Sequence, residues 1–134
     1  MSFNIQVYSR VDGLLGTEAI NDGSLDRAVT LPVTGQVLQK TFTIANAASK
    51  TIYSTDFANF KFLRVVSDLN TRMVLTDTAS NTFAVRLRGT GVADKYGVPF
   101  QLGSDVTASG QTLITMVVHN ASGNTAKVKV LVFS

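Results

Sequence analysis

The chain has 134 residues, of which 45% are hydrophobic and 16% are charged, a balance that indicates one folded domain and excludes a disordered chain. The absence of cysteine excludes disulfides, thiolate catalysis and zinc–thiolate sites. The net charge of +3 permits attraction to an acidic surface without requiring nucleic acid. No apolar run approaches the ~20 residues of a membrane-spanning helix, and the first residues show no secretory signal.

Residue types across the whole chain favour strands over helices. There are 17 valines and 16 threonines, whose branched side chains fit a pleated sheet and lose rotamer freedom in a helix. Glu18 is the only glutamate, against eight aspartates, and aspartate favours turns and caps. We therefore expect an almost all-β protein.

The N-terminal region begins with a half-buried strand at Phe3–Tyr8, because apolar and polar residues alternate there. Turns are predicted at Asp12–Gly13 and Asn21–Gly23, with a short strand or loop between them. A further strand at Leu25–Leu31 is expected to stop at Pro32, which cannot donate to a strand ladder.

The central region alternates with strand periodicity in several short runs. In Phe60–Val66 the apolar parity changes, which predicts either burial of both faces or a bulge near Leu63. Asn46–Lys50 is interpreted as a hairpin connection, and Ser67–Asn70 as a turn. The predicted strands are Gln36–Ala45, Thr51–Thr55, Phe60–Val66, Arg72–Leu75 and Phe83–Leu87.

The segment Gly89–Gly110 holds five of the ten glycines and is interpreted as a long loop that contains a short strand at Val98–Leu102. Long loops in compact domains are often functional. After it, Thr112–Asn120 and Ala126–Phe133 predict a β-hairpin. The turn Asn120–Thr125 is similar to Asn46–Thr51, which we attribute to shared turn chemistry.

These elements predict a single all-β domain over residues 1–134. We expect a jelly-roll-like β-sandwich of about eight to ten short, mostly antiparallel strands, with the glycine-rich loop at 89–110.

Candidate chemical groups are few. His119 is the only histidine, so it cannot form a multi-histidine metal site, and we interpret it as a strand residue at a sheet end or subunit contact. Asp68 and Asn70 do not match a calcium loop and are expected to shape a turn. Gly89–Asp94 resembles a phosphate loop but lacks a third glycine and a following helix. We expect no enzyme, cofactor or metal.

Four arginines lie on neighbouring predicted strands: Arg64, Arg72, Arg86 and Arg88. Arg86 and Arg88 share one face, and Lys127 and Lys129 form a second solvent-facing pair. Single-stranded nucleic acid would need aromatic residues interleaved with such charges, but the chain has no tryptophan and its tyrosines are scattered. We therefore expect no nucleic-acid partner and no membrane partner.

Four stretches in the C-terminal half carry motifs. They are Phe60–Asp68, Met73–Leu75, Val98–Leu102 and Val117–Val128. Their pattern, F-x-F-L-x-V-x-S-D, then short strands, then N-x-S-G-x-x-A-x-V-x-V, resembles small β-sandwich virion proteins of tailed bacteriophages. The resemblance covers roughly Phe60 to Phe133 and rests on structural motifs. It implies a structural role on the particle, either as a capsid cement (decoration) protein or as a tail or fibre attachment module.

From this resemblance we expect a capsid cement protein, made in the host cytoplasm and bound as a homotrimer to the exterior of the virion shell. Its partners would be the major capsid protein or another virion protein, and its own copies. The alternative is a tail or fibre module, including a carbohydrate-binding one. The expected contact residues lie in the first strand, the glycine-rich loop and the basic pairs: Phe3, Ile5, Val7, Arg86, Arg88, Asp94, Lys95, Tyr96, Lys127 and Lys129.

Overall fold

The computed structural model describes residues 3–15, 18–33, 37–53, 62–77, 80–103 and 113–133. This part of the chain is built of antiparallel strands and contains no helix, which confirms the prediction of an all-β protein. It accordingly holds no helix long and apolar enough to cross a membrane. The chain divides into two compact units, Met1–Gly35 and Gln36–Ser134, and each is described by itself. That residues 1–134 form a single domain stays a prediction.

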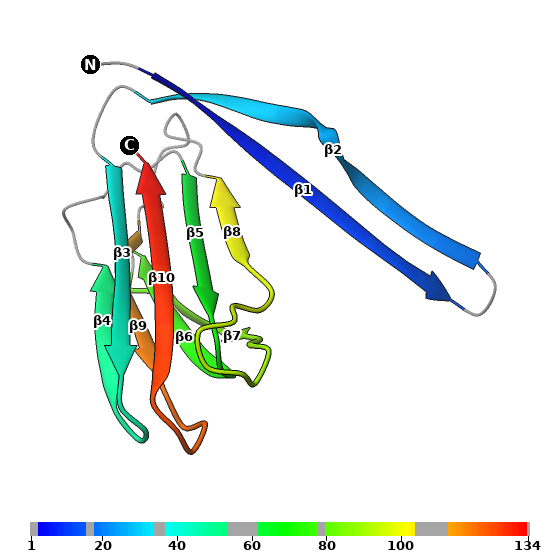
Figure 1. The fold of residues 1–134 in the computed structure, drawn as a ribbon. Coiled ribbons are helices and arrows are strands. Elements are labelled where there is room, and N and C mark those ends of the chain that lie inside the picture. Colours follow the sequence, from blue (N-terminus) through cyan, green and yellow to red (C-terminus); the bar gives the residue numbers. More distant parts are fainter. Residues whose placement is uncertain are drawn as a thin grey trace. The chain divides into compact units, whose positions relative to one another are not determined.

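The first unit is a two-stranded antiparallel sheet of β1 (Phe3–Leu15) and β2 (Glu18–Val33) (Figure 1). The predicted turns at residues 12–13 and 21–23 are wrong, because Asp12 and Asn21 are in register opposite each other inside the ribbon. Turn-forming residues favour a turn only through local interactions. Pairing between two long strands outweighs that local preference. Pro32 does not stop the ladder either: it lies opposite Asn4, at a position where an edge strand tolerates proline.

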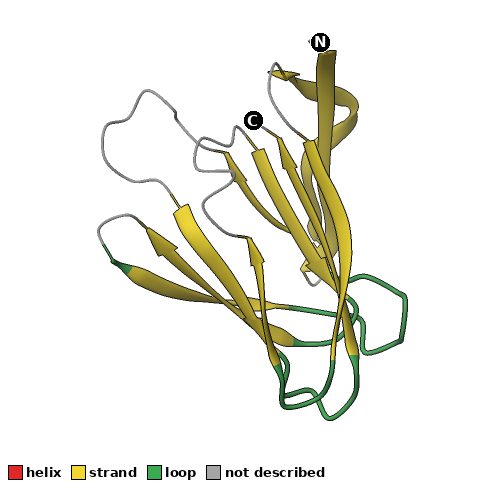
Figure 2. Ribbon diagram, turned by 90° about the vertical axis from the view of Figure 1, so that its left-hand side faces the viewer, coloured by secondary structure: helices red, strands yellow, loops and turns green. Residues whose placement is uncertain are grey.

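The described residues of the second unit form eight strands in two four-stranded sheets, with the orders β3-β10-β5-β8 and β4-β9-β6-β7. The two sheets form two layers (Figure 2). The strands are β3 (Val37–Ile44), β4 (Ser49–Tyr53), β5 (Phe62–Ser67), β6 (Thr71–Asp77), β7 (Thr82–Leu87), β8 (Phe100–Gly103), β9 (Leu113–His119) and β10 (Ala126–Phe133).

Strand pairing in this unit is nested. The first strand pairs with the last, β3 with β10, and then β4 with β9, β5 with β8 and β6 with β7, all antiparallel. A long hairpin paired in this way and rolled up so that β10 also meets β5, and β9 meets β6, is a jelly roll. The expected jelly-roll-like sandwich is confirmed, and it occupies the second unit.

This topology corrects one prediction made from the sequence. β9 and β10 were expected to pair as a hairpin, but they belong to different sheets, and so do β3 and β4. Both strands of each pair bury a row of residues in the same core, as Val118 of β9 and Val128 of β10 show. Alternation reveals a strand and its buried face, but it does not name the partner strand.

The core lies between the two sheets. Val128, Val130 and Val132 of β10 are each at most 1% exposed, and burial of one such side chain contributes about 1.5–3 kcal/mol. In β5, Leu63 and Val65 are buried, and so are Phe62 and Val66 on the opposite parity. Because no register shift interrupts β5 in either of its pairings, the parity change in the sequence reflects two faces that are both at least partly buried, with Arg64 exposed on the second.

Candidate functional site

The described part of the glycine-rich loop, residues 89–99, is fastened to the sandwich by the buried side chain of Asp68. One carboxylate oxygen accepts a hydrogen bond from the backbone N–H of Lys127 at 2.8 Å, and the other from that of Asp94 at 3.0 Å. The Asp68 carbonyl also accepts from the N–H of Gly91 at 3.1 Å. Asp68 lies in the connection between β5 and β6, as expected, but both carboxylate bonds go to segments distant in sequence, so its side chain anchors the loop and β10.

Glycine is required in this loop by close packing. A Cβ atom on Gly89 would collide with the backbone of Asp68, and one on Gly97 would collide with the carbonyl of Arg88. Gly91 has a φ of +82°, a backbone conformation that residues with a side chain rarely adopt. The glycine content therefore reflects a tightly fitted loop.

Four predicted contact residues gather where this loop meets β10. The Lys127 ammonium lies 2.5 Å from the Asp94 carboxylate, and that of Lys129 lies 4.3 Å from the centre of the Tyr96 ring. The hydrogen bond and charge of Asp94 raise the pKa of Lys127 above 10.5. Burial, and then the charges of Asp68 and Asp94, raise the pKa of Tyr96 above 10.0. These four side chains therefore interact with one another within the chain.

The other predicted contact residues lie elsewhere. Lys95 is exposed in the loop, and its carbonyl accepts a hydrogen bond from the Thr90 hydroxyl at 2.5 Å. Arg88 is exposed just after β7, and its carbonyl accepts from the N–H of Val98. The three apolar residues of β1 are in register opposite apolar residues of β2, in the pairs Phe3–Val33, Ile5–Leu31 and Val7–Val29. Their contact with another protein stays a prediction.

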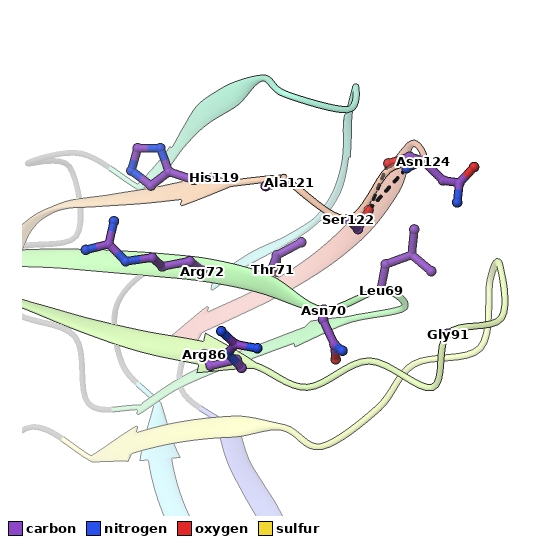
Figure 3. A pocket seen from close by; sticks show the side chains of 10 residues that line it. All are labelled: Leu69, Asn70, Thr71, Arg72, Arg86, Gly91, His119, Ala121, Ser122 and Asn124. Carbon is purple, nitrogen blue, oxygen red and sulfur yellow. Dashed lines mark hydrogen bonds between the residues drawn. The ribbon is translucent and has the colours of Figure 1, made fainter.

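A row of polar residues crosses the second sheet at one end. Ser49 is in register opposite His119, His119 opposite Arg72, and Arg72 opposite Arg86, so that the row spans β4, β9, β6 and β7. Figure 3 shows His119, Arg72 and Arg86 one above the other on three neighbouring strands. His119 ends β9, as expected for a histidine at a sheet end, and its Nδ1 lies 2.5 Å from the Ser49 hydroxyl.

Beside this row lies an open pocket of about 750 Å³, which we call the arginine pocket. Its lining includes Arg72, Arg86, His119, Thr71, Ser122 and Asn124 (Figure 3), and among the described residues it contains no acidic side chain and no Phe, Tyr or Trp. In the described part of the chain, neither arginine takes part in an ion pair.

The wall formed by the turn after β9 is held in place by Asn120. This residue is 1% exposed, and its amide nitrogen donates to the carbonyls of Ile44 and Asn124, each at 2.8 Å. Its amide oxygen accepts from the backbone N–H and the hydroxyl of Ser122. The pocket wall is thus part of a closed hydrogen-bond network.

The sequence places Arg72 and Arg86 on neighbouring predicted strands but does not group His119 with them. That grouping depends on the register between β6 and β9, two strands that are distant in the chain. Among the described residues, no three His, Cys, Asp or Glu side chains lie together as a metal site would require. No protein-family model matches this sequence, and a search of curated proteins finds no match to it.

Proposed function

We propose that this chain is a structural protein of a tailed-bacteriophage virion, and specifically a capsid cement protein that binds the outer shell across neighbouring capsomers. The proposal rests on the motif resemblance in residues 60–133 and on an eight-stranded jelly roll, an architecture found in viral capsid and lectin domains. A cement role requires surfaces that bind other proteins, and it requires no chemical reaction.

The observation that carries the proposal is the two-stranded first unit. Within the described residues, β1, of 13 residues, and β2, of 16 residues, pair only with each other, so each strand keeps one unpaired edge. A two-stranded sheet is at best marginally stable alone in water, and open strand edges add readily to a foreign sheet. The ribbon is therefore suited to completing its sheet on another protein.

Binding of this kind would stabilise a shell by mass action. A protein that binds only the assembled shell lowers the free energy of that state. In a homotrimer, three contacts act together, and their effective concentration strengthens the whole attachment. Each contact that spans two capsomers would oppose their separation.

Co-sedimentation tests the proposal directly. Capsids of the phage that encodes the chain, assembled without it, are mixed with the purified full-length protein and pelleted. We expect saturable binding to the shell, reduced by Ile5→Asp in the ribbon and unchanged by the control Lys50→Gln on β4. Absence of binding to capsids at every stage of maturation would refute the cement role.

The second candidate is a tail or fibre attachment module. The arginine pocket favours it, because hydrogen-bonding groups at the end of a sandwich are suited to a surface ligand. Electron microscopy of particles with an antibody-labelled copy distinguishes the two roles. Label on the head supports the cement protein, and label on the tail supports the attachment module.

A further inference from the structure

The arginine pair in the arginine pocket is an unfavourable arrangement for the fold alone. Arg72 and Arg86 are directly opposite each other on adjacent strands, and like charges in that position are destabilising. His119 adds a third basic side chain on the other side of Arg72. Because no carboxylate of the described residues lines the pocket, none of them compensates the charges of the two arginines. An arrangement that weakens the fold at one place is a sign of a binding site.

The rest of the pocket lining also carries polar groups. Thr71 also lies at the pocket, but it is 4% exposed and its buried hydroxyl is on the same parity of β6 as Met73 and Leu75, so it is not counted among the groups that meet a ligand. Asn70, Ser122 and Asn124 bring amide and hydroxyl groups to the same lining.

The residue types of the lining define the chemistry of the ligand. Two guanidinium groups bind a carboxylate or a phosphate well, and the neutral amides and hydroxyls suit a ligand that carries several hydroxyl groups. Among the described residues, the lining has no Phe, Tyr or Trp, the large rings on which successive bases of single-stranded nucleic acid stack. An isolated acidic side chain of a protein would leave the amide and hydroxyl groups unused.

We propose that the arginine pocket binds an acidic saccharide, in which a carboxylate meets Arg72 and Arg86 and the sugar hydroxyls meet the polar groups of the opposite wall. The volume of about 750 Å³ lies in the range of ligand sites. The site is also preorganised, because Ser49 contacts the His119 ring and Asn120 fixes the turn that carries Ser122. This inference does not depend on where the protein sits on a particle.

The test is a calorimetric and thermal-shift titration of the full-length protein. The probes are glucuronic acid and N-acetylneuraminic acid, with glucose as the neutral sugar, inorganic phosphate as the simple anion and a triglutamate peptide as the protein-like acid. We expect saturable binding of at least one sugar acid, at least tenfold tighter than binding of glucose, phosphate or the peptide. That binding should also raise the melting temperature.

Two variants and one control separate binding from folding. Arg72→Gln and Arg86→Gln should each weaken sugar-acid binding roughly tenfold or more, because each removes a charge-assisted contact. Both should melt at or above the temperature of the parent protein, because each removes the like-charge pair. Arg64→Gln, in which an exposed arginine of the other sheet is changed, should bind as the parent does.

Three results would overturn the inference. They are equal binding of phosphate or triglutamate, binding that survives in both arginine variants, and absence of binding to either sugar acid. None of these results bears on co-sedimentation with capsids, so the two proposals fail independently.

Discussion

The side-chain oxygen of Asn46 accepts a hydrogen bond from the backbone N–H of Gly123 at 2.9 Å, across 77 positions of sequence. The bond joins the turn between β3 and β4 to the turn between β9 and β10, the two segments whose sequences are similar. Their asparagines act differently, because Asn46 is exposed and Asn120 is buried. Each turn carries the chain from one sheet to the other, so the pair clamps this end of the sandwich.

Replacing Asn120 should destabilise the second unit. Asn120→Ala leaves the carbonyl of Ile44 and the turn around Ser122 without their partners, and we expect a loss of about 2–4 kcal/mol in the free energy of unfolding. Urea denaturation measures the loss. Asn124→Ala is the matched control, since Asn124 is exposed and should cost under ~0.5 kcal/mol. Equal losses in the two variants would contradict this role.

Replacing Asp68 should release the loop. Asp68→Ala removes the acceptor for the N–H groups of Asp94 and Lys127, at an expected cost of about 1–3 kcal/mol. Hydrogen exchange should show faster exchange at both amides. Asp68→Asn keeps one oxygen acceptor and should retain part of the protection. Unchanged exchange at Asp94 in Asp68→Ala would show that other contacts hold the loop.

Two glycines should respond differently to alanine. Gly97→Ala forces a Cβ into the carbonyl of Arg88, so we expect a loss of at least ~2 kcal/mol and displacement of the loop. Gly123 has a φ of +93° but nothing nearby for a Cβ to meet, so Gly123→Ala should cost only about 1 kcal/mol of backbone strain. Thermal unfolding of both variants provides the comparison, and the reverse order of melting temperatures would be inconsistent with a close-packed loop.

Alkaline solution should weaken the attachment of the loop to β10. The folded-state pKa of Lys127 is raised, so its stabilising contribution is complete below 10.5 and is lost as the pH rises through the higher folded value. The pKa of Tyr96 is also raised, so its ionisation above pH 10.0 is disfavoured in the folded state and opposes folding. Unfolding free energies measured from pH 8 to 12 should therefore fall at the alkaline end. A double variant, Lys127→Gln with Tyr96→Phe, should show a smaller fall, and an identical fall would exclude these two groups as its source.

The sequence predicts the strands of the second unit well because alternation reports burial residue by residue. The valines at positions 128, 130 and 132 of β10 are all in the core, and the parity change in β5 corresponds to two faces that are both at least partly buried. The same reasoning fails wherever a partner strand decides the outcome. It places turns at Asp12 and Asn21, which pair with each other, and it joins β9 to β10 as a hairpin. The arginine pocket was missed for the same reason, since local patterns carry no information about register between distant strands.

The position of β10 between β3 and β5, and of β9 between β4 and β6, has a consequence for biosynthesis. Both central strands are translated after the four strands that flank them. Until they emerge from the ribosome, the earlier strands lack their main pairing partners, so neither sheet closes before β9 and β10 are available. Folding must wait for contacts between distant segments, which is typical of proteins that fold in milliseconds to seconds. During that delay, the unpaired strand edges of one nascent chain can pair with those of a second nascent chain. Aggregation is therefore most favoured before the two sheets close.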